Sequence, residues 1–209
     1  MNKKDSKLKK NFWQIFYAIL AALIIRSFLY EPFSIPSGSM YPNLKVGDYL
    51  FVSKFSYGYS RNSLPFSIPL IPGRIFYSEP ERGDIVVFKT PEDNRTDYIK
   101  RLIGLPGDKI QFIDSNLYIN NSEVLKSKIS NNDKIYCGNQ QIEVFTFEEN
   151  LSSNKTYKTV YLKNFSYQNS DVFIVPEDYY FFLGDNRDCS KDSRYLSSVG
   201  YVHKDNLVG

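Results

Sequence analysis

Two serines that flank a glycine stand just after the most apolar run of the chain. Ser37, Gly38 and Ser39 lie between Pro36 and Pro42, and the two prolines disfavour a continuous helix through this segment. A serine in such a turn can present its Oγ to a bound substrate. Its own backbone N–H, and a second hydroxyl two residues earlier, can point at the same place. Because Ser-Gly-Ser is also frequent in ordinary loops, the stretch becomes a candidate site only if the chain supplies a base.

The composition limits which residue type can be that base. The chain has one histidine, His203, and its neighbours Val202 and Lys204 favour an ordinary surface position. A metal centre built on two histidines is excluded, and the two cysteines are too far apart in sequence for a Cys-x-x-Cys pair. A lysine is the next candidate.

A lysine is a working base near neutral pH only where burial lowers its pKa from about 10.4, by up to ~3–5 pH units. Such a lysine should stand in an apolar strand. Lys100 fits this best, because residues 98–103 predict a strand in which it shares a face with Tyr98 and Leu102. Arg101 points the other way. A lysine at a sheet edge with its amine in solvent is the alternative that this strand alone leaves open.

A dense polar loop at 184–194 is the third candidate element. Ser190 could give or accept the hydrogen bond that aims a neutral lysine amine at the nucleophile. Charge-assisted hydrogen bonds could fix the loop, made by Asp185, Arg187, Asp188, Asp192 and Arg194. A calcium-binding or solvated acidic turn is the alternative, and the two interleaved arginines argue against calcium because they would repel a cation.

The N-terminal part combines a basic tail with an apolar run. Residues 1–10 hold five lysines and one aspartate, while 12–25 are apolar except for one glutamine, and the run continues past Arg26 to Tyr30. This length is close to the roughly 20 residues that cross a bilayer as a helix. Because the lysines precede the run, we expect the N-terminus in the cytoplasm and the remainder outside. We predict a cytoplasmic tail at 1–10 and a transmembrane anchor at 11–30. A buried core helix is the alternative, since no small-x-small site for a cleaved signal peptide follows.

The rest of the chain, 31–209, predicts a mainly β domain. Short runs of aromatic and β-branched residues alternate with turn residues, and Ile85–Phe88 is apolar on both faces, which predicts a central, buried strand. A small inserted β lobe is predicted at 113–172, because the chain is more polar there. Residues 58–81 hold several prolines among apolar residues and predict a long irregular loop that packs over the core, lines a groove or touches lipid.

Charge and cysteine content narrow the partners and the compartment. The net charge of +3 comes from the lysines of residues 1–10, and the body is close to neutral, which argues against a nucleic-acid partner. Cys137 and Cys189 could pair in an oxidising compartment or remain free thiols, and the sequence leaves both possibilities open.

Five blocks, in this order along the chain, resemble bacterial type I signal peptidases. After the anchor come Ile-Pro-Ser-Gly-Ser-Met at 35–40, Arg-Gly-Asp-Ile-Val-Val-Phe at 82–88, Tyr-Ile-Lys-Arg-Leu-Ile-Gly-Leu-Pro-Gly-Asp at 98–108, and Gly-Asp-Asn-Arg-Asp-Cys-Ser-Lys-Asp-Ser-Arg at 184–194. The resemblance covers the anchor and the main domain but hardly the segment 121–170. It implies a coiled antiparallel β-sheet catalytic domain behind a transmembrane helix.

By this resemblance Ser39 is the nucleophile and Lys100 the general base. The Ser39 backbone N–H and the Ser37 hydroxyl would form the oxyanion hole, and Ser190 would orient Lys100. Four further residues would form structural ion pairs, Arg101 with Asp185 and Asp192 with Arg194. Cys189 departs from the family pattern, in which we expect asparagine.

The family removes signal peptides from exported preproteins at the outer face of the cytoplasmic membrane, cutting after small residues. The resemblance implies attack by Ser39, an acyl-enzyme, and hydrolysis by water that Lys100 activates. It implies no metal or cofactor, preprotein signal peptides and the lipid bilayer as partners, and a monomer. Two alternatives remain. One is a Ser/Lys peptidase for another substrate, as in self-cleaving repressors or in pilus or conjugation processing. The other is an inactive, membrane-tethered β domain that binds exported proteins.

Overall fold

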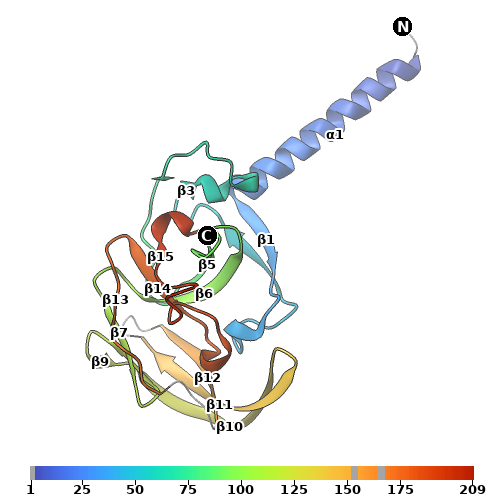
Figure 1. The fold of residues 1–209 in the computed structure, drawn as a ribbon. Helices are drawn as coiled ribbons and strands as arrows, with labels where there is room; N and C mark the ends of the chain where they lie inside the picture. Colours follow the sequence, from blue (N-terminus) through green and yellow to red (C-terminus); the bar gives the residue numbers. More distant parts are fainter. Residues whose placement is uncertain (1–2, 152–154, 164–167) are drawn as a thin grey trace.

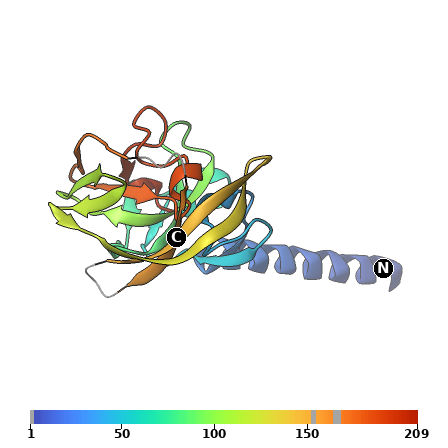
Figure 2. The same ribbon diagram turned by 90° about the horizontal axis from the view of Figure 1, so that it is seen from below.

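The computed structural model describes residues 3–151, 155–163 and 168–209. One long helix, α1 (Lys3–Phe28), leaves a β-rich body at one end (Figure 1). The view from below shows the same helix pointing away from the body (Figure 2). The helix begins inside the predicted tail 1–10, whose first two residues lie outside the described residues. It ends at Phe28, and Tyr30 already begins a strand.

The apolar part of α1 is largely unburied. Its segment Lys9–Phe28, 20 residues long, is apolar and long enough to cross a membrane. The large side chains from Phe12 to Leu29 are all exposed, and a helix that is apolar all round is stable only when an apolar medium or other protein surrounds it. The chain thus has one N-terminal apolar helix, consistent with a membrane anchor.

The body is mainly β, as the sequence predicts. Every named strand pair in the described residues is antiparallel. The strands are β1 (Tyr30–Ser34), β2 (Tyr49–Ser53), β3 (Tyr59–Ser60), β4 (Arg74–Ile75), β5 (Ile85–Lys89), β6 (Asp97–Gly104), β7 (Lys109–Ile113), β8 (Asn116–Ile119), β9 (Ser122–Glu123), β10 (Leu125–Cys137), β11 (Gln140–Asn150), β12 (Thr156–Leu162), β13 (Phe173–Ile174), β14 (Tyr179–Leu183) and β15 (Val202–His203). Short 3-10 turns connect them: η1 (Gly38–Met40), η2 (Arg61–Ser63), η3 (Pro65–Ser67), η4 (Arg187–Cys189) and η5 (Lys204–Asn206).

A four-stranded sheet with the order β15-β14-β6-β5 lies at the centre of the body. Along β14, successive side chains point to opposite faces. Phe181 and Leu183 lie in one apolar cluster, together with residues of β7 and β8. Tyr180 and Phe182 lie in a second cluster, on the other face. Because both faces are buried, these strands appear in the sequence as nearly continuous apolar runs.

The strand predicted from Ile85–Phe88 is buried, but its place in the sheet differs from the prediction. β5 is the last strand of the ladder, paired only with β6. Its outer edge is covered instead by the end of the chain, where Val87 N donates to Gly209 O at 2.8 Å and Val208 N donates to Val87 O at 2.8 Å. An edge strand that is covered in this way needs no polar face, which is why the sequence alone suggested a central strand.

A three-stranded sheet has the order β10-β11-β12. It falls within the predicted lobe 113–172, whereas β8 and β9 belong to another sheet with β7 and β13. Figure 1 shows the β10–β11 hairpin at the end of the body away from α1, and its tip approaches η1, where a Cβ on Gly38 would lie 3.4 Å from Tyr136 O. The long irregular segment predicted at 58–81 contains only the short elements β3, η2, η3 and β4.

Candidate active site

Ser39 lies in the short turn η1, which follows strand β1 after the connecting residues 35–37. Ser37 precedes the turn in an extended conformation (φ −133°, ψ 153°). The two hydroxyl oxygens are 3.3 Å apart, and the Ser39 residue is only 7 % exposed. The turn therefore brings both serines to one place, as the spacing of the sequence suggested, and the Tyr41–Pro42 bond that follows is cis.

Lys100 reaches Ser39 from β6, across 61 residues of sequence. Lys100 Nζ donates to Ser39 Oγ at 2.7 Å and to the backbone oxygen of Ile99 at 3.0 Å. The lysine is 4 % exposed, and the ring of Tyr98, on the same face of β6, lies 5.2 Å from Nζ. The predicted placement of Lys100 in an apolar strand is thus what the structure has.

Burial lowers the pKa of Lys100 to about 8, although Asp192 and Asp185 act in the opposite direction. A charged amine is poorly solvated in this site. In the part of the chain that the structure describes, no carboxylate forms an ion pair with Lys100. The arrangement gives a lysine that loses its proton near neutral pH and a hydroxyl in contact with it, which is a nucleophile and its base.

Asp185, the second residue of the loop 184–194, is held by Arg101 through two hydrogen bonds. Arg101 Nε and Nη2 donate to the two carboxylate oxygens, each at 2.7 Å. Both side chains are buried, at 9 % and 0 % exposure. Asn43 Nδ2 donates to the same carboxylate at 2.7 Å. Lys100 and Arg101, adjacent on β6, therefore serve opposite faces, as strand geometry requires.

A second buried ion pair lies within the loop. Arg194 Nε donates to Asp192 Oδ1 at 2.8 Å, with side-chain exposures of 4 % and 0 %. The other carboxylate oxygen of Asp192 accepts the backbone N–H of Gly184 at 3.0 Å. The Asp192 carboxylate therefore connects Gly184, at the beginning of the loop, with Arg194, at its end, and holds the two ends of the loop together.

Two loop residues to which the sequence assigned no role hold the nucleophile turn itself. Asn186 N donates to Ser39 O at 3.0 Å, and Asn186 Nδ2 donates to Gly38 O at 3.1 Å. A Cβ placed on Gly184 would lie 2.6 Å from Ser39 O and would also overlap Ser190, so only glycine fits there. The loop 184–194 therefore packs against the backbone of residues 38–39 and donates hydrogen bonds to it. These contacts depend on tertiary packing, and the only sequence signal was the position of both residues in the polar loop.

Arg187 finds its partner outside the loop. Arg187 Nη2 donates to Glu149 Oε2 at 2.6 Å, and both side chains are 1 % exposed. The hydroxyls of Tyr157 and Tyr161 donate to the same carboxylate, each at 2.7 Å. Glu149 is not recognisable as a site residue from sequence, because it lies in the polar segment 121–170. The sheet β10-β11-β12 thus supports the loop from behind.

Ser190 lies in the same cleft wall as Lys100 and is 5 % exposed. Its Oγ lies close enough to Asp192 to help lower the pKa of that carboxyl, but within the described residues it forms no hydrogen bond of ordinary geometry. Lys100 Nζ donates to Ile99 O and Ser39 Oγ instead. The structure therefore brings Ser190 to the site without the lysine contact that the resemblance implies.

His203, the single histidine, lies outside the cleft. It caps η5 by accepting the Asp205 N–H at 3.3 Å and does not line the cleft.

The serines and Lys100 open into a cleft of about 1080 Å³. Its walls come from η1, β6, the tip of the β10–β11 hairpin and the loop 184–194; among the lining residues are Ser37, Ser39, Tyr98, Lys100, Tyr136 and Ser190. This cleft is large enough for several residues of a bound peptide.

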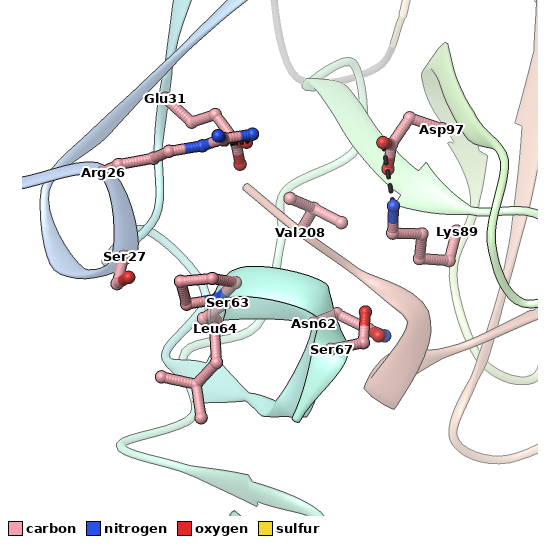
Figure 3. A pocket seen from close by; sticks show the side chains of 11 residues that line it. Arg26, Ser27, Glu31, Asn62, Ser63, Leu64, Ser67, Lys89, Asp97 and Val208 are labelled. Carbon is pink, nitrogen blue, oxygen red and sulfur yellow. Dashed lines mark hydrogen bonds and ion pairs between the residues drawn. The ribbon is translucent and has the colours of Figure 1, made fainter. Parts of the chain in front are cut away.

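A second, smaller pocket of about 140 Å³ lies where α1 meets the body. Figure 3 shows Arg26 directed at Glu31, and Lys89 at Asp97. The Arg26–Glu31 and Lys89–Asp97 contacts are 2.6 Å and 2.8 Å. Ser27 also lines this pocket, but the cations there are already paired, so it does not provide a neutral base beside a hydroxyl.

Comparison with known proteins places these features in context. The family model described as signal peptidase, peptidase S26, matches residues 8–209. A signal peptidase I of Rickettsia typhi is 46% identical over 222 residues, with 100% of this chain and 82% of the relative covered. That of Rickettsia akari is 46% identical over 209 residues, covering 96% and 76%. A signal peptidase I structure from Enterococcus faecalis has 30% sequence identity and a TM-score of 0.40, and covers 63% of this chain and 96% of that one. The family match includes every residue of the cleft.

Proposed function

The chain belongs to the signal peptidase family, peptidase S26, and we propose that Ser39 and Lys100 are the nucleophile and base with which it removes signal peptides. That it is a serine endopeptidase of this kind follows from the family; the roles of individual residues are the proposal. The observation that carries it is the 2.7 Å contact between Lys100 Nζ and Ser39 Oγ in a buried cleft.

Acylation begins when neutral Lys100 takes the proton of Ser39 Oγ. The oxygen then attacks the carbonyl carbon of the scissile peptide bond, and the carbonyl electrons move to its oxygen. When the tetrahedral intermediate collapses, the C–N bond breaks and the Lys100 ammonium returns the proton to the leaving amine. The signal peptide is then an ester on Ser39. Lys100 next takes a proton from water, which attacks the ester carbonyl, and the proton returns to Ser39 Oγ as the acid is released.

The negative oxygen of the intermediate needs donors beside Ser39. We assign this role to the Ser39 backbone N–H and the Ser37 hydroxyl, whose oxygen lies 3.3 Å from Ser39 Oγ. A donor of this kind contributes about 10²–10³ in kcat. A serine hydroxyl turns its hydrogen to suit its partner, so the Ser37 O–H can turn from Ser39 Oγ to the carbonyl oxygen as charge develops.

Ser190 and the two ion pairs have supporting roles. Once Ser39 is an ester, its oxygen is a poor partner for the lysine amine, and the buried Oγ of Ser190 in the same cleft wall is available to orient it. The Arg101–Asp185 and Asp192–Arg194 pairs hold the loop 184–194 in place. In both ion pairs the carboxylate binds an arginine and forms no ion pair with Lys100.

The anchor sets where this chemistry takes place. We propose a cytoplasmic tail at 1–10, a membrane-spanning segment at 11–30 and an extracytoplasmic catalytic domain at 31–209 with an inserted lobe at 113–172. The lysines before the apolar helix support this orientation. The substrates are then exported preproteins presented at the outer face of the cytoplasmic membrane, and the bilayer itself is the second partner.

Cleavage of a preprotein by the full chain in detergent tests the assignment. We expect wild type to cut after a small residue, and Ser39→Ala and Lys100→Ala to be inactive while folded. Ser197→Ala and Lys158→Ala are matched controls, because both residues are exposed and lie outside the cleft. A Lys100→Ala protein that cuts as fast as wild type would exclude Lys100 as the base.

A further inference from the structure

Cys137 and Cys189 form a disulfide that links the inserted sheet to the catalytic loop. Their Cα atoms are 5.9 Å apart, within the usual range for this bond. The sequence left their pairing open, because 52 residues separate them. In the structure Cys137 ends β10 at the tip of the β10–β11 hairpin, and Cys189 ends η4 immediately before Ser190.

The bond joins two parts of the cleft wall that come from different elements. Tyr136, Cys137 and Gly138 line the cleft from the hairpin tip, and Cys189 and Ser190 line it from the loop. The disulfide therefore lies at the surface that a bound peptide would contact, and it is half-buried at both ends.

The hairpin tip also touches the nucleophile turn. A Cβ placed on Gly38 would lie 3.4 Å from Tyr136 O, so the tip packs directly on the backbone next to Ser39. The loop holds the same backbone from the other side through Asn186. Hairpin, turn and loop thus form a closed ring of contacts, and the disulfide is its only covalent member in the described residues.

Beyond Ile135, which is buried with Val144 and Val160, few contacts other than the one with Gly38 hold the tip. Its last residues pair with each other, in the ladder Tyr136↔Gln141 and Cys137↔Gln140. Tyr136 is 67 % exposed, and Gly138 is exposed as well. A hairpin end with few buried apolar contacts opens easily. The loop, by contrast, is also held by the Arg101–Asp185, Asp192–Arg194 and Glu149–Arg187 pairs, none of which involves the disulfide.

We propose that the Cys137–Cys189 disulfide is a positioning element that fixes the hairpin tip as a wall of the substrate cleft, so that peptide binding depends on the redox state of this pair. The inference rests on the proposed function of Ser39 and Lys100. Breaking the S–S bond frees the tip but leaves the dyad and its ion pairs in place. The effect therefore falls on KM more than on kcat.

The test compares oxidised and reduced wild type with a variant that lacks both thiols. Reduction with a water-soluble phosphine breaks the S–S bond to two thiols; the phosphine is oxidised to its oxide with oxygen from water. Thiol titration should find no free thiol before this step and two after it. We expect KM for a preprotein to rise about tenfold on reduction, with kcat changing less than about twofold.

The Cys137→Ser, Cys189→Ser double variant is the matched control. It should show the raised KM without reductant and should not respond to the phosphine. A purely structural role for the bond would lower the melting temperature and leave KM unchanged, and that result would overturn the proposal. Free thiols in wild type as purified would overturn it too. If oxidised wild type does not cut at all, the proposed function fails and this inference with it, whereas an active enzyme with one KM in both states contradicts the inference alone.

Discussion

Two buried lysines of this chain have similar exposure and different surroundings. Lys54 is 1 % exposed and Lys100 is 4 % exposed. Lys54 Nζ, near the junction of anchor and body, donates to Glu31 Oε2 at 2.9 Å. Lys100 Nζ, in the cleft, donates to Ser39 Oγ at 2.7 Å, and the ion pairs of the described chain do not include it.

Burial alone does not distinguish the two residues, because it lowers the pKa of both. The difference is the counter-ion. The Glu31 carboxylate beside Lys54 favours the charged amine, and the ammonium is then a structural group. Near Lys100 the carboxylates of Asp185 and Asp192 are occupied by Arg101 and Arg194. Lys100 can therefore act as a base, because the neighbouring carboxylates are bound by arginines and do not stabilise its ammonium form. Lys54, which has its own carboxylate partner, cannot.

The largest expected effect comes from removing each amine in turn. Lys100→Met should lower kcat by at least about 10²–10⁴-fold, because a general base contributes this much. Lys54→Met should leave kcat within about twofold, because its amine is paired and does not line the cleft. Cleavage assays on both purified variants compare them directly.

Thermal unfolding should rank the same two variants in the opposite order, with the larger loss of stability in Lys54→Met. Lys54→Met removes a partner of Glu31, which keeps only Arg26, and should lower stability by about 1–3 kcal/mol. Lys100→Met removes a poorly solvated amine and should cost less than that. If the two variants lost activity equally, the presence of a carboxylate partner would not explain why one lysine is a base and the other a structural group.

A smaller effect is expected when a carboxylate near Lys100 is released from its arginine. In Arg101→Met, Asp185 keeps Asn43 but loses the guanidinium. Its negative charge would then raise the pKa of Lys100 and make it resemble Lys54. We expect kcat/KM at pH 7 to fall about tenfold for each unit of that rise and to recover as the pH increases. Lys158→Ala is the control, and a rate that is equally low at every pH would contradict this explanation.

The smallest effect concerns Ser190. Its buried Oγ forms no hydrogen bond of ordinary geometry in the described part of the chain, and its effect on the nearby Asp192 carboxyl is the smallest of the causes that lower that group's pKa. Ser190→Ala should therefore change stability by at most about 1 kcal/mol. If Ser190 orients Lys100 after acylation, kcat should still fall about tenfold, mostly in the hydrolysis step. Single-turnover kinetics would show an accumulating acyl-enzyme, and cleavage at the wild-type rate would remove Ser190 from the mechanism.

The sequence predicted the reactive groups better than the contacts that hold them. Lys100 was recognisable because strand alternation placed it among apolar residues, and Ser39 because two prolines isolate its turn. The burial of Lys54 and its pairing with Glu31 were not recognisable, since they follow from the β1–β2 register. Glu149 was missed for the same reason, because its partner Arg187 lies on another element. Such pairings depend on how sheets pack, which local patterns do not encode.

The pH dependence of kcat/KM in wild type tests the central claim most directly. Only neutral Lys100 can take the Ser39 proton, and its pKa is lowered by burial to about 8. We predict that kcat/KM falls about tenfold per pH unit below this value and levels off above it. Lys54→Met should keep the same midpoint. A midpoint near the ordinary lysine pKa of about 10.4, or no change between pH 6 and about 9, would contradict the account.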